Sequence, residues 1–212
     1  MLSQSPGPSG HDALPDVTHQ PCSEGAVAPP GGSITDPLLE EEFLRAHEWL
    51  RDRLVPNDIY AALSVANAPG KFHWSIFLCE SNGFGHKFHA ATDGVPDGQW
   101  RYECAPWSAW NDSRVVAFFP MGEMPQGLDH THLNEYLQTI PMEVPSIDRL
   151  CEPRFTCRVW FKAAVRLLND VEMFVRCSDV DGLEMQLANR ATAAQFSDGI
   201  KLLVQSCARP WP

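Results

Sequence analysis

One cysteine and two histidines have the residue types and surroundings that thiol chemistry needs. His73 and His89 each stand in a short apolar segment, 72–78 and 87–90, that alternates as a β-strand does. Cys157 opens an amphipathic segment typical of a helix. The partial positive charge of a helix N-terminus favours a thiolate, and an imidazole within reach completes its activation. The pattern predicts an acyl-transfer site with Cys157 as nucleophile and His73 as general base.

The base in turn needs a group that orients it. His89 is the first candidate, because its ring could hydrogen-bond the far nitrogen of His73 and fix the tautomer. Asp93 and Glu103 are alternatives, and backbone N–H groups at the start of the Cys157 helix could bind an oxyanion. Each residue alone also has a simpler interpretation. A cysteine on a core-facing helix is usually a small buried apolar group, and a strand histidine is often a hydrogen-bonded filler.

Short strands separated by turn sequences must position the two histidines. Ala-Pro-Gly, Ser-Asn-Gly-Phe-Gly and Pro-Asp-Gly supply the turn chemistry. The strands expected between these turns are Tyr60–Val65, Phe72–Cys79, His86–Ala91, Trp100–Glu103 and Arg114–Phe119. A further strand is expected over Val171–Cys177.

Four helices complete the expected fold. Asp36-Pro37 predicts the start of a helix that ends at Pro56, and a second helix is expected over His130–Thr139. The thiol-bearing helix should run over 155–168 with Thr156 as its cap, and a last helix should open near Asp181. This order predicts an α+β fold in one domain, 34–212, with a small antiparallel sheet packed against helices. Residues 1–33 are rich in Pro, Gly and Ser, which predicts a disordered tail.

Composition excludes several classes of protein. A formal net charge of −11 argues against a generic nucleic-acid surface, so no DNA partner is expected. Seven cysteines, an odd number without paired spacing, and no basic-then-apolar N-terminus favour reduced thiols in the cytoplasm. No CxxC pair occurs, and His130 and His132 suit a solvated helix start better than a metal site. We expect no metal and no cofactor.

A basic stripe follows the thiol-bearing helix. Arg154, Arg158, Lys162 and Arg166 recur at every fourth position. One interpretation is a solvated helix face. The other is a landing surface beside the thiol for a substrate that carries phosphate or nucleic acid.

The three segments resemble those of the circularly permuted NlpC/P60 papain-like superfamily, especially its lecithin retinol acyltransferase group. The matching stretches are His73-Trp74-Ser75, Phe88-His89-Ala90 and Thr156-Cys157-Arg158. The resemblance covers roughly residues 60–170 and implies a permuted papain-like fold with Cys157 as nucleophile, His73 as base and His89 as orienting residue. The chain departs from the group at Thr156, where members have Asn. It also lacks their C-terminal membrane-anchoring segment, so no membrane-lipid substrate is expected.

The chain is also similar to small proteins of fungal genomes that carry a His-Trp … Cys-x-x-Trp arrangement. More distantly it resembles fungal arginine-containing cyclodipeptide synthases, enzymes of secondary metabolism that use aminoacyl-tRNA and carry an Asp-Asp-x-x-Glu motif. The nearest match here is Asp179, Asp181 and Glu184. The resemblance implies that these acids meet an arginyl group while Arg154 and Arg158 meet tRNA. The alternative is a capping box, with Asp181 as N-cap and Glu184 at the third helical position.

The leading hypothesis is a cytoplasmic enzyme that forms a thioester on Cys157. Its specific version is aminoacyl transfer towards a cyclic dipeptide, with a small acyl or aminoacyl substrate, tRNA-borne in that version. One alternative is a thiol hydrolase of amide or isopeptide bonds. Another is a non-catalytic binding module. The sequence does not indicate an oligomeric state.

Overall fold

The computed structural model describes residues 53–92, 98–196, 202–203 and 206–211. The chain divides into two units, Met1–Thr35 and Asp36–Pro212, and every described residue belongs to the second. The expected tail over 1–33 and most of the expected helix from Asp36 lie outside the described residues.

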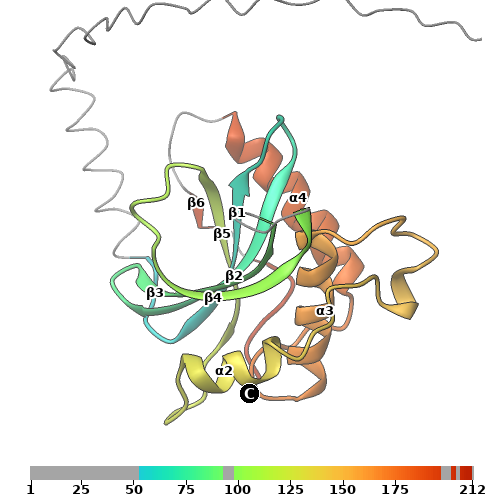
Figure 1. The fold of residues 1–212 in the computed structure, drawn as a ribbon. Helices are drawn as coiled ribbons and strands as arrows, with labels where there is room; N and C mark the ends of the chain where they lie inside the picture. The colour runs from blue at the N-terminus through green and yellow to red at the C-terminus, as the bar shows by residue number, and fades with distance from the viewer. Residues whose placement is uncertain (1–52, 93–97, 197–201, 204–205, 212) are drawn as a thin grey trace, which may run out of the picture. The chain divides into compact units, whose positions relative to one another are not determined.

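A curved sheet forms the centre of the second unit (Figure 1). Its strand order is β4-β3-β2-β1-β5-β6, antiparallel throughout except for the parallel pair β5 and β6. The strands are β1 (Asp58–Val65), β2 (Phe72–Ser81), β3 (Phe84–Ala91), β4 (Arg101–Ser108), β5 (Val115–Glu123) and β6 (Leu202–Leu203). Together with the helices they confirm the predicted α+β class.

The turn between β2 and β3 has the chemistry that its sequence indicates. Asn82 and Gly83 both have positive φ, 44° and 79°, the backbone that a two-residue hairpin turn requires. Gly83 also lies under the indole of Trp110, where an added Cβ would stand 2.0 Å from a ring carbon. This turn fixes the register of the two histidine-bearing strands.

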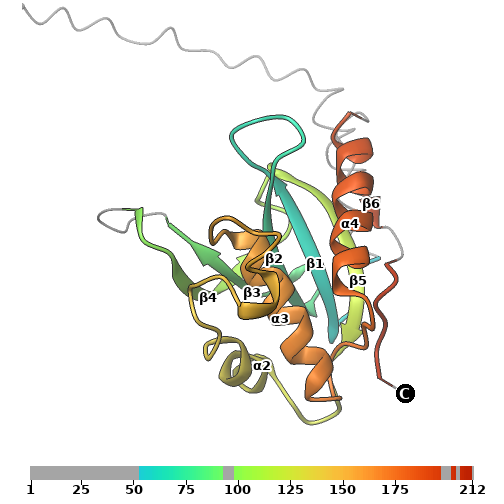
Figure 2. The same cartoon turned by 90° about the vertical axis from the view of Figure 1, so that its right-hand side faces the viewer.

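Within the described part of the chain, three α-helices accompany the sheet (Figure 2). They are α2 (His130–Leu137), α3 (Cys157–Asp170) and α4 (Val180–Gln195), and a 3-10 turn, η2, covers Ser146–Asp148. The predicted cap of α3 is confirmed, because the Thr156 side chain accepts a hydrogen bond from the N–H of Val159.

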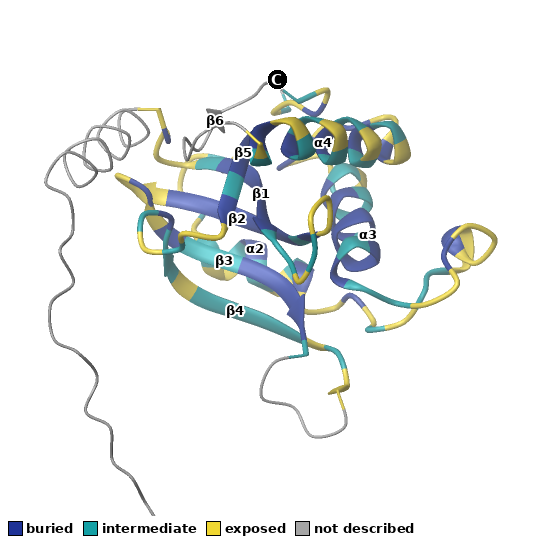
Figure 3. Ribbon diagram, turned by 90° about the horizontal axis from the view of Figure 1, so that it is seen from above, coloured by how far each residue is buried: buried dark blue, intermediate teal, exposed yellow. Residues whose placement is uncertain are grey.

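The main hydrophobic core lies between α3 and one face of β2 and β3. Trp74 of β2 packs on Phe161 of α3 with ring centroids 5.1 Å apart, and Tyr102 of β4 packs on Trp160 at 5.9 Å. The buried surfaces of β1, β2 and α3 meet at this core (Figure 3). A smaller core on the other face of the sheet contains Phe77.

Two local predictions were wrong. Residues 171–177 do not form a strand, and only Val175 and Arg176 make isolated bridges there, while the short parallel strand β6 was not foreseen. Helix α4 begins at Val180 with Asp179 as its cap, so Asp181 lies in the first turn rather than at the N-cap. No helix among the described residues is both long and apolar enough to cross a bilayer.

Candidate active site

The two histidines predicted to act together are in contact. His73 near the start of β2 and His89 near the end of β3 place Nε2 and Nδ1 2.7 Å apart, with their rings at 89° to each other. On the far side of His89, Nε2 lies 3.3 Å from a carboxylate oxygen of Glu103 on β4. The contact places His89 where an orienting group for His73 is needed.

The histidines bridge a place where two strands part. Pairing between β2 and β3 runs from the hairpin only as far as Ile76 and Phe88, whereas β3 continues to pair with β4 as far as Ala91. The start of β2 therefore has β1 on one side and no ladder partner from β3 on the other. The imidazole pair spans this opening between the strands.

The partners of His89 fix the proton positions along the chain of contacts. Nε2 of His89 faces the Glu103 carboxylate in an ion-pair contact, and the negative charge favours a proton on that nitrogen, which leaves the lone pair of His89 on Nδ1. His73 must then donate from Nε2 to that lone pair. In this arrangement the lone pair of His73 lies on Nδ1.

His89 is held neutral. Burial, reinforced by the electrostatic effect of the neighbouring His73, Lys87 and Arg101 side chains, lowers the pKa of His89 from 6.5 to about 3. Its residue is only 7% exposed, which agrees with burial as the dominant cause. A neutral His89 is the state that the proton positions above require near neutral pH.

Cys157 is the first residue of α3, and its sulfur lies against the backbone of β2. The N–H groups of Trp74, Arg158 and Cys157 itself face the sulfur. The side chain of Trp74 packs on α3, so His73 points to the opposite face of β2. A Trp74 N–H that faces the sulfur is directed away from β1, towards the parted edge. Cys157 belongs to the core cluster on the Trp74 face of the sheet, and among the described residues no hydrogen bond joins its sulfur to His73.

Burial raises the pKa of Cys157 above its ordinary value, and this effect outweighs the three N–H groups and the charge of Arg158, which lower it. The residue is 9% exposed. A thiol acidified by the helix N-terminus is therefore not the resting state. Proton removal must accompany attack, which makes the position of a base more important.

Most of the basic stripe is neutralised by carboxylates. Lys162, 3% exposed, lies 3.2 Å from Asp148, 3.4 Å from Glu152 and 2.7 Å from Asp181. Burial acts to lower the pKa of Lys162, but the hydrogen bonds that Lys162 donates to Asp181 and Asp148 outweigh it and raise the pKa. The carboxyl of Asp148 also binds Arg166, at 2.6 and 2.9 Å.

The other expected substrate contacts are also engaged within the protein. Arg158 pairs with Glu152 at 2.5 Å and with Glu184 at 3.2 Å, and Asp179 accepts the N–H of Gly182 as a helix cap. Asp179 lines a shallow hollow with Arg166 and Asp170, at the opposite end of α3 from the thiol. Arg154 is exposed in the segment before α3. The structure thus gathers Cys157, Arg158 and Glu184 near one end of α3 and places Asp179 at the other.

Comparison with known proteins gives a family but no activity. Residues 59–175 match the model of a family of unknown function, DUF6540. The chain belongs to this family. No curated protein matches the chain, and no solved structure matches it. In this DUF6540 protein the matched range contains His73, His89, Glu103 and Cys157 and ends before Asp179.

The structure also gathers three residues that sequence reasoning did not connect. Glu80, His86 and His130 come from three separate segments and place their ligand atoms close together. His130 was assigned to a solvated helix start, a role that the structure gives to His132, which completes the capping box with Asp129. No spacing rule could have joined His130 to Glu80, because 50 positions separate them.

Proposed function

We propose that this protein is a cysteine-dependent acyl-transfer enzyme that works through a thioester on Cys157. The observation that carries the proposal is the chain of contacts from His73 through His89 to Glu103. His73 directly precedes Trp74, whose backbone N–H faces the Cys157 sulfur. A filler histidine needs one hydrogen bond. A base oriented by a second side chain, which in turn faces a carboxylate, is the arrangement that thiol catalysis uses.

In the proposed reaction the sulfur of Cys157 attacks the carbonyl carbon of the acyl donor. A carbon–sulfur bond forms, and the thiol proton passes to Nδ1 of His73, which becomes an imidazolium and keeps its Nε2 hydrogen bond to His89. The bond to the leaving group then breaks, and that group takes the proton from His73. An amine, alcohol or water attacks the thioester in the second half, gives its proton to His73 and returns the thiol.

Each neighbour of the pair has a defined role in this reaction. Glu103 faces the positive charge that develops on the histidine pair and keeps His89 in the tautomer that accepts from His73. The N–H groups of Cys157 and Arg158 point to the side where the sulfur and the carbonyl oxygen meet, and they are donors for the oxyanion. Because both groups already exist in the resting protein, little reorganisation is needed.

Aminoacyl transfer remains the specific version, and it rests on the sequence resemblance. The geometry supports the broader class, since Arg158, Asp181 and Glu184 already form ion pairs within the protein. An arginyl or phosphate group would have to exchange with those pairs.

Intact-protein mass spectrometry with activated acyl donors tests the proposal. The protein is incubated with a panel of acyl and aminoacyl thioesters, in a background where the exposed Cys151 and Cys207 are replaced by Ser. One acyl group should add to Cys157. The adduct should be absent in Cys157→Ala and at least about 100-fold slower to form in His73→Gln.

The buried Cys79 supplies a matched control, because Cys79→Ala removes a thiol distant from the histidine pair and should leave acylation unchanged. Equal acylation of the wild type and Cys157→Ala would refute the proposal. If the adduct forms, its decay in water alone indicates a hydrolase, and decay that requires an added amine indicates a transferase.

A further inference from the structure

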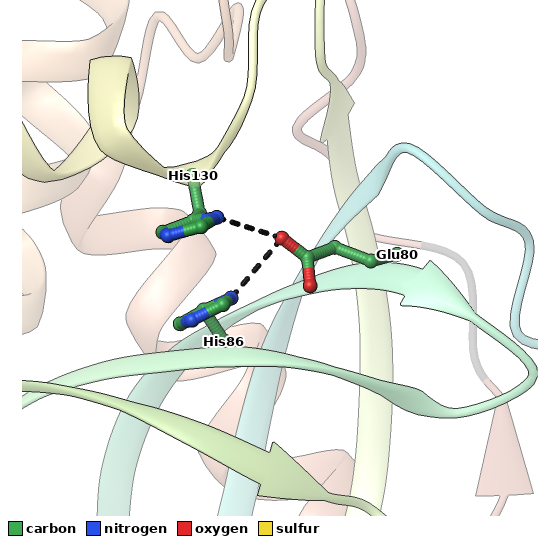
Figure 4. A group of neighbouring side chains, drawn as sticks. All are labelled: Glu80, His86 and His130. Atoms are coloured by element: carbon green, nitrogen blue, oxygen red, sulfur yellow. Dashed lines mark hydrogen bonds and ion pairs between the residues drawn. The ribbon is translucent and has the colours of Figure 1, made fainter.

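Three side chains from three segments of the fold converge at one point (Figure 4). Glu80 lies near the end of β2, His86 lies on β3, and His130 is the first residue of α2. One carboxylate oxygen of Glu80 lies 3.1 Å from Nδ1 of His86 and 2.9 Å from Nδ1 of His130. The two Nδ1 atoms point to the same oxygen.

The imidazole rings are stacked, with centroids 3.5 Å apart and planes within 11°. To donate to one oxygen, each ring must carry its proton on Nδ1, which aligns the two ring dipoles side by side. Parallel dipoles at this distance repel each other, and two imidazolium rings would repel more strongly. A cation between the three donor atoms removes this conflict, because each ring then turns a lone pair rather than a proton towards the centre.

From these contacts we propose that Glu80, His86 and His130 form a binding site for a divalent transition metal of the zinc class. A tetrahedral zinc ion with bonds of about 2.0–2.1 Å separates its ligand atoms by about 3.3 Å. The two contacts with Glu80 are within a few tenths of an ångström of that spacing, and all three ligand atoms lie within 4.8 Å of one another. Binding requires the two stacked rings to rotate apart, so that their planes intersect at the ion.

The donor set selects the class of ion. Two imidazole nitrogens and one carboxylate oxygen suit zinc, cobalt or nickel, whereas calcium and magnesium prefer oxygen ligands throughout. Three protein ligands leave a fourth position for water. The exposed fractions of the side chains, 39% for Glu80, 15% for His86 and 32% for His130, leave the cluster open to solvent.

The site is separate from the thiol chemistry. His86 and His89 differ by an odd number of positions on β3, so their side chains point to opposite faces of that strand. A bound ion would link the β2–β3 hairpin to the start of α2. The expected effect is therefore stabilisation of this link.

Metal titration of the full-length, metal-stripped protein tests the proposal. Competition with a chromophoric chelator should show that the wild type binds one zinc ion per chain at this site and that variants of the three ligand residues do not. Each of the three ligand variants, His86→Gln, His130→Gln and Glu80→Gln, should weaken zinc binding by about 100-fold or more. Loss of a residue that only supports a ligand already lowers metal affinity by about 10–100-fold. Cobalt bound at the same site should show the visible absorption of a four-coordinate ion.

His132→Gln is the matched control, since it removes an exposed histidine from the same helical turn and should retain the zinc site. Cys157→Ala should retain it as well. If a variant fails to fold, protection of His86 and His130 from diethyl pyrocarbonate by zinc in the wild type provides the same test. Binding that persists in the three ligand variants, or absence of protection, would show an adventitious ion only and overturn the proposal.

Discussion

Replacing His89 should change how the stability of the protein depends on pH. The buried ring has a pKa of about 3 in the folded chain and near 6.5 when unfolded. Between these values the unfolded chain takes up a proton that the folded chain does not. The stability linked to His89 is therefore fully present above about pH 6.5 and is lost as the pH falls towards 3.

The size of the effect follows from the two pKa values. Each unit of pKa difference corresponds to about 1.4 kcal/mol. The buried, neutral His89 therefore lowers the free energy of unfolding by about 2 kcal/mol at pH 5 and by almost nothing at pH 7.5. His89→Gln cannot titrate at this position. The unfolding free energy of the wild type, minus that of the variant, should be about 2 kcal/mol lower at pH 5 than at pH 7.5.

Urea unfolding followed by circular dichroism at both pH values measures this difference. His73, Lys87, Arg101 and Glu103 face the ring and are present in both proteins. His132→Gln serves as the control for loss of one exposed histidine.

A difference that stays constant with pH within about 0.5 kcal/mol would refute the buried, neutral His89 and with it the assigned proton positions. If His89→Gln does not fold, the ring can be titrated by NMR in the wild type. A pKa near 6.5 would then refute the same reasoning.

Three further results are expected. Lys162→Met should destabilise the fold by about 3–5 kcal/mol in urea unfolding, because it leaves buried carboxylates without their cation. Arg114→Met removes an exposed arginine from an ion pair and should destabilise the fold by under about 1 kcal/mol. Equal losses of stability in the two variants would contradict the buried network. Glu103→Gln removes the negative charge that faces the histidine pair, so the acylation rate should fall about 100-fold or more with little change in unfolding temperature. An unchanged rate would remove Glu103 from the mechanism. Gly85→Ala should lower the unfolding temperature sharply, since its Cβ would stand 1.9 Å from the carbonyl oxygen of Leu78, and an unchanged temperature would show that β2 and β3 can separate there.

Local chemistry made most of the fold predictable. The Asn82-Gly83 turn and the Thr156 cap depend on residues within four positions of one another, and both were placed correctly. The β6 strand was missed because two residues carry no period, and their pairing with β5 depends on a partner more than 80 positions away.

The candidate site was predictable in part. Alternation and one resemblance indicated His73 and His89, and the structure brings the two rings into contact, while their roles stay predictions. The stripe through Lys162 was visible from its spacing. Its partners were not, because Asp148 reaches α3 from an irregular segment that has no pattern of its own. The direction of the Cys157 pKa depends on burial, which a helix-start rule does not contain.

The segment between α2 and α3 is anchored by two inward-facing carboxylates. Asp148 and Glu152 bind the cations of α3, so the residues between them face solvent, and Leu150 is 99% exposed. Cys151, also exposed, lies in the short segment between these two anchoring carboxylates. A fluorophore or spin label attached to Cys151 would move with the start of the thiol-bearing helix. It would report movement of that helix when an acyl donor binds, without itself modifying Cys157.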